Sequence, residues 1–211
     1  MFGFLKKSNI TDEEAMGKFQ KGDTKCFDLL LGRHSKGVYR FIYRMVGGNI
    51  MNAEDILQEV FIKVSENRMN YSKDKKFTAW LYRIARNHTI DFLRKESYRM
   101  HSSLDKNIGN DEGANVTYLE LVKSDDKTQD EQVHSNMVRE QLFEKMKGLK
   151  DEYREVFILR EIEGLKFDEI AVITDSNVNT VKSRHRYAFK ELRELLLSTG
   201  FFDEYKKTGE V

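Results

Sequence analysis

The sequence predicts an all-α protein: two small helical domains joined by a flexible acidic linker, the C-terminal domain being a helix-turn-helix. The 211 residues include no proline, and no alternation of polar and apolar residues is long enough for a strand. Apolar residues recur instead at helical spacing. Charge is segregated along the chain, since residues 1–100 hold 19 basic and 12 acidic side chains (+7), residues 101–140 hold 4 and 9 (−5), and residues 141–211 hold 13 and 14 (−1).

The composition also excludes several classes of protein. A lone cysteine, Cys26, rules out an internal disulfide and a cysteine-based zinc cluster, and the five histidines lack ligand spacing. We therefore expect no metal and no cofactor. No apolar run approaches the roughly 20 residues of a membrane span, and the first seven residues are too short for a signal peptide. A soluble, cytoplasmic protein without membrane insertion is expected.

The first predicted domain covers residues 9–98. Thr11 and Glu14 form a capping-box pattern at the start of a helix that should end near Gly22. A further helical pattern begins at Asp23-Thr24 and stops at Gly47-Gly48. The next helix is predicted to start with Asn52 as its N-cap. Its buried stripe comprises Ile56, Leu57, Val60, Phe61 and Val64, and its opposite face comprises Glu54, Asp55, Gln58 and Glu59.

Residues 77–95 are predicted to form the central helix of this domain. One face carries Phe77, Leu81, Ile84, Ala85, His88 and Phe92, and a flanking face carries Trp80, Arg83, Asn87, Ile90 and Arg94. A flat aromatic ring, guanidinium groups and an amide can stack on an unpaired base, bind its edge and hold phosphates. Taken alone, the helix is more typical of a surface helix with a partly buried tryptophan.

The neighbourhood of this helix favours nucleic-acid binding. Residues 68–100 hold nine basic and three acidic side chains, interleaved with Tyr71, Phe77, Trp80 and Tyr82. A basic stripe with aromatic residues is the electrostatic footprint of a nucleic-acid interface. Residues 66–76, which precede the helix, are polar and are predicted to form a loop.

Residues 99–133 have the composition of a linker, being rich in Ser, Asn, Asp and Gly, with a possible short helix at 116–122. The second predicted domain covers residues 134–200. A short helix (F-D-E-I-A-V-I), a turn (T-D-S-N) and a long helix from Val178 give the order of a helix-turn-helix. In the long helix the predicted inward residues are Val178, Val181, His185, Ala188, Phe189, Leu192 and Leu196. Residues 179–193 hold five basic side chains and one acidic.

Three motifs resemble those of bacterial extracytoplasmic-function (ECF) sigma factors. They are F-T-A-W-L-Y-R-I-A-R-N…D-F-L-R-K, A-E-D-I-L-Q-E and T-V-K-S-R, and the resemblance spans about residues 12–196. It implies a non-enzymatic promoter-specificity subunit that binds core RNA polymerase and promoter DNA. It also implies an anti-sigma factor as a regulatory partner. The negatively charged linker would thread the RNA-exit path of the polymerase.

The resemblance assigns residues to three interfaces. It implies that the minus-10 element is bound and melted by Asn70, Tyr71, Trp80, Arg83, Asn87 and Arg94. Within this set, Tyr71, Asn70 and Asn87 would hold a flipped base. Reading of the minus-35 element falls to Thr180, Lys182, Ser183, Arg184, Arg186 and Tyr187. Contact with the polymerase β′ clamp helices falls to Glu54, Asp55, Gln58 and Glu59. The polymerase β flap is expected on the apolar surface of the second domain.

The second domain departs from the family pattern in its turn and in its reading helix. Asp175 occupies the turn where the family has glycine, and Asn177 follows as a good N-cap. His185, expected to be a core histidine, replaces a common leucine. Tyr187 and Phe189 replace two frequent arginines. The promoter sequence therefore cannot be transferred from relatives.

Two other classes of function fit parts of the sequence. A stand-alone helix-turn-helix repressor or activator would have no use for a base-capturing aromatic helix, and it would commonly be a dimer. A nucleic-acid hydrolase could use Glu54, Asp55 and Asp91. The sequence lacks a phosphate-binding glycine loop, a metal-ligand cluster and a nucleophile constellation, which argues against an enzyme.

Overall fold

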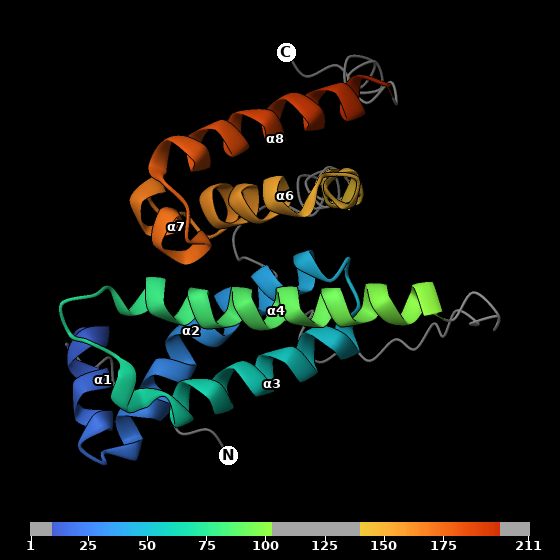
Figure 1. The fold of residues 1–211 in the computed structure, drawn as a ribbon. Helices are drawn as coiled ribbons and strands as arrows, with labels where there is room; N and C mark the ends of the chain where they lie inside the picture. Colours follow the sequence, from blue (N-terminus) through green and yellow to red (C-terminus); the bar gives the residue numbers. More distant parts are fainter. Residues whose placement is uncertain (1–9, 103–139, 199–211) are drawn as a thin grey trace, which may run out of the picture. The chain divides into compact units, whose positions relative to one another are not determined.

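The computed structural model describes residues 10–102 and 140–198, and all regular structure within these ranges is helical (Figure 1). The all-α prediction is thus confirmed. The chain divides into two compact units, the first including residues 10–102 and the second most of residues 140–198. The predicted acidic linker, its possible short helix and both chain ends lie outside the described residues.

The first unit is a bundle around a long central helix. Its elements are α1 (Asp12–Gln20), α2 (Thr24–Met45), α3 (Ile50–Glu66), the 3₁₀ turn η1 (Arg68–Asn70) and α4 (Phe77–Ser102). Helix α2 packs against α1, α3 and α4, and α3 also packs against α4 (Figure 1). The core comprises Met16, Leu30, Val38, Phe41, Ile42, Ile56, Val60, Val64, Phe77, Leu81 and Ala85, all nearly inaccessible to solvent. The predicted buried stripe of α3 is confirmed.

The ends of these helices follow local side-chain chemistry. Thr11 Oγ1 accepts a hydrogen bond from the Glu14 amide, and the Glu14 carboxylate accepts one from the Thr11 amide, so the predicted capping box is confirmed. The prediction of Asn52 as a helix cap was wrong by three residues. Asn49 is the N-cap of α3, and its Oδ1 accepts a hydrogen bond from the Asn52 amide at 2.9 Å. Helix α4 continues to Ser102, beyond the predicted boundary at residue 98.

The second unit contains the predicted helix-turn-helix. Residues 140–147 are helical and are followed by α6 (Asp151–Phe157), a π-helical turn η3 (Ile158–Ile162), α7 (Phe167–Thr174) and α8 (Val178–Ser198). Helix α6 packs against α8. Asp175 has the left-handed backbone expected at the turn, with φ of 52°. Asn177 Oδ1 accepts a hydrogen bond from the Thr180 amide at 2.8 Å, as expected of an N-cap.

The inward face of α8 differs from the prediction at one position. Val181, Ala188 and Leu192 are buried, but Phe189 is 48% exposed. Its ring contacts Phe157 and His185 at the edge of the core, at centroid distances of 5.4 and 4.9 Å. Its angular position at the margin of the apolar stripe explains why helical periodicity alone placed it inside.

Candidate nucleic-acid interface

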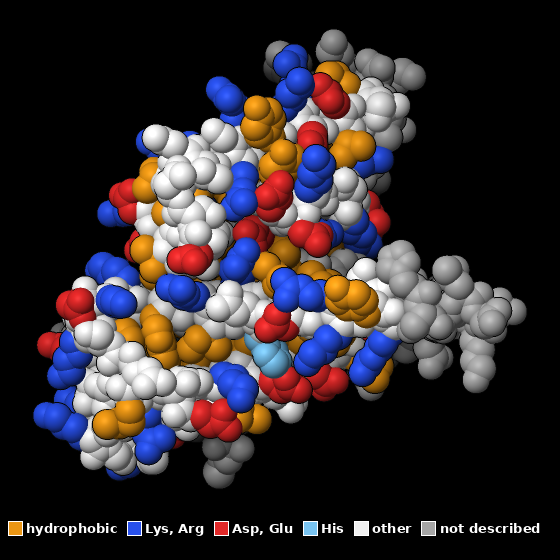
Figure 2. Space-filling model, viewed as in Figure 1, with side chains coloured by type: hydrophobic (Ala, Val, Ile, Leu, Met, Phe, Trp, Pro, Cys, Tyr) orange, Lys and Arg blue, Asp and Glu red, His pale blue; other side chains and the backbone are white. Residues whose placement is uncertain are grey.

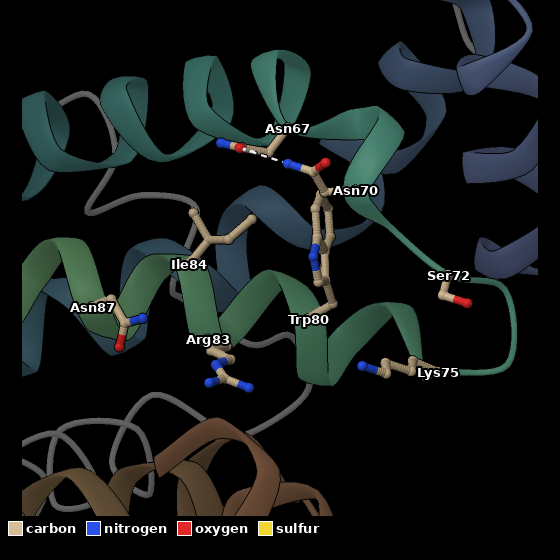
Figure 3. Close-up of a pocket in the computed structure, with 8 residues that line it drawn as sticks. All are labelled: Asn67, Asn70, Ser72, Lys75, Trp80, Arg83, Ile84 and Asn87. Atoms are coloured by element: carbon tan, nitrogen blue, oxygen red, sulfur yellow. Dashed lines mark hydrogen bonds between the residues drawn. The ribbon is translucent and has the colours of Figure 1, made fainter. Parts of the chain in front are cut away.

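A polar pocket of about 320 Å³ opens between α4 and the segment that follows α3 (Figure 3). Trp80 forms an aromatic wall directed toward Asn70 (Figure 3), and the two lining amides, Asn70 and Asn87, belong to different elements, the turn after α3 and α4. The lining residues are Asn67, Asn70, Ser72, Lys75, Trp80, Arg83, Ile84 and Asn87. Four of the six residues predicted for the minus-10 element therefore meet in one pocket: Asn70, Trp80, Arg83 and Asn87.

Tyr71 lies behind this pocket and not in it. Its side chain is only 4% exposed, and its ring meets Trp80 and Phe77 edge-on, at centroid distances of 5.3 and 5.9 Å. Its hydroxyl donates a hydrogen bond to the Lys75 carbonyl oxygen at 2.7 Å. Burial raises the pKa of Tyr71 to about 12. The expectation that Tyr71 stacks on a base is corrected, because the ring is already packed; it supports Trp80 and the loop instead.

The amide groups of the pocket rim are linked by hydrogen bonds. Asn70 Nδ2 donates to Asn67 Oδ1 at 3.2 Å (Figure 3), and Asn67 Nδ2 donates to the Lys63 carbonyl at 2.9 Å. Asn87 Oδ1 accepts a longer bond of 3.4 Å from Arg86. The first two bonds orient the Asn70 amide from the end of α3. Asn87 is exposed on α4 and also lines the pocket.

Some predicted residues lie outside the pocket, and some lining residues were missed. Arg94 is exposed, pairs with Asp91 at 3.5 Å and does not line the pocket. Tyr82 of the predicted aromatic stripe is buried against Phe41, at a centroid distance of 5.9 Å. The missed lining residues are Asn67, Ser72, Lys75 and Ile84. Three of these lie in the segment that the sequence identified only as a polar loop.

Helix α3 presents the predicted acidic face to solvent. Asp55, Gln58 and Glu59 are exposed, and Glu54 is partly exposed. Glu59 contacts His88 Nε2 of α4, which ties this face to the helix that carries the pocket. Figure 2 shows acidic side chains beside a histidine where these helices lie, and Lys and Arg side chains along α4.

An apolar groove of about 600 Å³ runs beside this acidic face, between α2 and α3. It was not predicted. Its lining residues are Phe27, Leu31, Ser35, Leu57, Gln58, Phe61, Ile62 and Ser65. Gln58 thus belongs to both surfaces, and Ile62 exposes 56% of its surface there. The sequence assigned Leu57 and Phe61 to the core but could not show that α2 leaves their outer edge uncovered.

In the second unit, α8 presents a basic outer face. Lys182 and Arg186 are exposed, Tyr187 is 45% exposed, and Ser183 and Thr180 are partly exposed. Arg184 is directed elsewhere. Its guanidinium binds Ser176 Oγ and the Glu152 carboxylate, each at 3.0 Å, and so holds α8 to the turn and to α6. Although Arg184 was predicted to help read the minus-35 element, its charge is engaged within the domain.

His185 is partly buried and not a purely apolar core residue. Its Nε2 lies 2.8 Å from Glu161 Oε1, and its ring contacts Phe167 and Phe189. Within residues 10–102 and 140–198, no three His, Cys, Asp or Glu side chains gather into a possible metal site. None of the helices in this described part is long and apolar enough to cross a membrane.

The two units correspond to two known sequence domains. Residues 30–99 match sigma-70 region 2, and residues 139–192 match sigma-70 region 4. The chain is 34% identical over 177 residues to the ECF RNA polymerase sigma factor SigW of Bacillus subtilis. The aligned region covers 84% of this chain and 92% of SigW. The protein belongs to the ECF RNA polymerase sigma factors. The predicted resemblance is confirmed.

Another relative and two solved structures are consistent with this family assignment. The ECF RNA polymerase sigma-E factor of Escherichia coli K12 is 32% identical over 175 residues, covering 83% of this chain and 88% of that protein. Two solved structures share the fold. CnrH in complex with the cytosolic domain of CnrY has a TM-score of 0.63 at 20% identity, covering 89% of this chain and 97% of that chain. The sigma factor RpoE of Bartonella quintana in complex with NepR has a TM-score of 0.62 at 23% identity. The match covers 82% of this chain and 97% of that chain.

Proposed function

We propose that this sigma factor binds core RNA polymerase through the acidic face of α3 and directs initiation with two DNA-binding surfaces. The outer face of α8 reads the duplex minus-35 element. The pocket on α4 holds an unpaired base of the minus-10 element. The chain itself catalyses no reaction, and the polymerase supplies the nucleotide chemistry.

The composition of the α4 pocket carries this proposal. Its volume of about 320 Å³ suits one flat ligand of moderate size, since pockets for small ligands span about 300–1,000 Å³. Removing a base from the stack costs a few kcal/mol, and stacking on an aromatic ring returns about 1–3 kcal/mol per base. Trp80 supplies the ring, and Asn70 and Asn87 can bind the base edge. Lys75 and Arg83 supply positive charge for the backbone phosphates.

The remaining contacts of the proposal follow from the charged and apolar surfaces. Asp55, Gln58 and Glu59 project from one face of α3, which suits a basic or amide-rich partner helix such as the β′ clamp helices. The β flap is proposed to bind the apolar surface of the second unit, where Leu197 is about half exposed. The two structurally similar proteins above were solved with CnrY and with NepR, the latter described as an anti-sigma factor. We include an anti-sigma factor among the partners.

Two measurements test the proposal. Gel filtration with core polymerase lacking any sigma factor should give a stoichiometric complex. On a promoter selected with that complex, Asn87→Ala should reduce the reactivity of unpaired minus-10 thymines towards permanganate by about tenfold, corresponding to one lost interaction of about 1.4 kcal/mol. Lys95→Ala is the matched control, because Lys95 is exposed on the same helix and does not line the pocket.

The outcomes separate the two parts of the proposal. Failure of the folded protein to join core polymerase would contradict the polymerase-binding role. Co-elution combined with equal melting by Asn87→Ala and Lys95→Ala would contradict the pocket as the site of base capture.

A further inference from the structure

We propose that Tyr187, held in place by Tyr153, reads the methyl group of one thymine in the minus-35 duplex. The proposal deepens the duplex-reading function of α8 and rests on it. The two tyrosine rings are stacked, with centroids 5.8 Å apart and planes inclined by 26°. Tyr187 lies on the same outer side of α8 as Ser183 and Arg186 and still exposes 45% of its surface.

The tyrosine pair is not part of the core of the second unit. The buried residues of α8 are Val181, Ala188 and Leu192, whereas Tyr187 is about half exposed. Tyr153 is itself only partly buried at the start of α6. Cations lie near both rings: the Arg186 guanidinium is 5.6 Å from the Tyr187 centroid, and Lys150 Nζ is 5.7 Å from the Tyr153 centroid. An aromatic surface between two cations suits a groove bordered by phosphates.

The orientation of Tyr187 is fixed before DNA binds. Tyr153 covers one face of its ring. Arg184, three residues earlier, binds Glu152 of α6 and Ser176 of the turn, so α8 cannot rotate freely against α6. A contact group that is already ordered loses little side-chain entropy on binding.

The chemistry of an exposed ring edge selects thymine. In the major groove the C5 methyl of thymine is the apolar group among the base edges, and aromatic side chains contact it. Insertion of the Tyr187 ring between two bases is disfavoured because Tyr153 occupies one face of that ring. A tyrosine also lacks the paired N–H donors by which arginine binds guanine O6 and N7. At this position the protein should therefore prefer a T·A pair over G·C.

The geometry of α8 also gives the spacing of this contact. Tyr187 follows Ser183 by four residues, which is about 6 Å along a helix. Base pairs are stacked about 3.4 Å apart. The thymine read by Tyr187 should thus lie about two base pairs from the pair that faces Ser183.

The test uses holoenzyme reconstituted from core polymerase and the full chain. A random duplex pool is enriched by binding, and each thymine of an enriched minus-35 duplex is replaced singly by deoxyuridine, which lacks the methyl group. One position should weaken wild-type binding by about fourfold, the effect expected for one buried methyl. With Tyr187→Ser the duplex should bind more weakly and that position should become insensitive to uracil. Tyr187→Phe should keep the sensitivity.

Two further variants sharpen the test. Tyr187→Arg should change the enriched base at the same position from thymine to guanine. Phe189→Ser is the matched control, since Phe189 is a comparably exposed aromatic residue on the same helix that contacts Phe157 and His185. It should retain the uracil-sensitive position.

Contrary results would be equally clear. If wild-type holoenzyme enriches a minus-35 sequence that has no uracil-sensitive thymine, or if Tyr187→Ser keeps that sensitivity, the methyl contact is wrong while duplex reading by α8 stands. If no minus-35 sequence is enriched, the proposed reading function fails, and this inference fails with it. The uracil scan of the wild type needs no variant to fold.

Discussion

At the residue scale, Tyr71 shows how one buried hydroxyl can shape a binding pocket. The hydroxyl donates to the Lys75 carbonyl and so closes the loop that brings Ser72 and Lys75 to the pocket. Tyr71→Phe should lower the free energy of unfolding by about 1 kcal/mol, because the hydrogen bond from the Tyr71 hydroxyl to the Lys75 carbonyl is lost. Urea unfolding followed by circular dichroism measures this. Tyr98→Phe is the control, since Tyr98 is 71% exposed; an equal loss in both variants would contradict the assignment.

The pKa of the same residue predicts behaviour at alkaline pH. Its folded-state pKa is raised from 10.0 to about 12, so the neutral phenol is favoured in the native state. The associated stability is present below pH 10 and is lost as pH rises towards 12, because the unfolded chain ionises first. Urea midpoints measured across this window should fall more steeply for the wild type than for Tyr71→Phe. Parallel pH profiles would contradict the prediction.

The pocket also shows what helical periodicity can and cannot predict. The spacing of residues along 77–95 predicted that Trp80, Arg83 and Asn87 share a face, because a helix fixes those directions. Tyr71 and Tyr82 followed the same basic-aromatic pattern and are nevertheless buried. Their burial depends on Phe77 and Phe41, which approach from other segments. Asn67 and Lys75 were missed because the path of the loop is set by such tertiary contacts.

At the scale of elements, the turn between α7 and α8 depends on Asp175. A left-handed backbone costs roughly 1–2 kcal/mol for residues with ordinary side chains, and more for β-branched ones. Asp175→Val should therefore destabilise the second unit by at least about 1 kcal/mol, whereas Asp175→Gly should remain close to wild type. Thermal unfolding of the three proteins checks the order. A Val variant as stable as the Gly variant would show that the turn is not strained.

The packing of α1 against α2 depends on a charged cluster. Asp12 lies 2.6 Å from both His34 Nε2 and an Arg33 nitrogen, and the hydrogen bond from His34, aided by Arg33, lowers the pKa of Asp12 below 3.8. A lowered pKa stabilises the fold above the unfolded value, and this stabilisation is lost as pH falls through the folded value. Asp12→Asn should thus be less stable than wild type at neutral pH, and the difference should shrink below pH 3.8. Urea titrations at both pH values measure this.

At the scale of the whole molecule, the two helical units each have a core of their own. Phe41 and Leu81 are buried in the first, and Val156 and Leu192 in the second. The segregation of charge along the sequence predicted this division, because the acidic stretch separates two regions with helical apolar spacing. Fragments 10–102 and 140–198 should each unfold cooperatively, and the full chain should show both transitions in calorimetry. A single transition for the full chain, at a temperature unlike either fragment, would contradict independent folding.

The chain contains a single tryptophan, Trp80, and it forms the wall of the α4 pocket. The protein therefore carries its own optical reporter, and its emission comes from the place where a base is proposed to be held. Titrating the free protein with single-stranded minus-10 DNA should quench this emission, and Asn87→Ala should shift the midpoint to higher DNA concentration. Unchanged emission at saturating DNA would place the bound base elsewhere. Base capture can thus be followed in solution without attaching a dye.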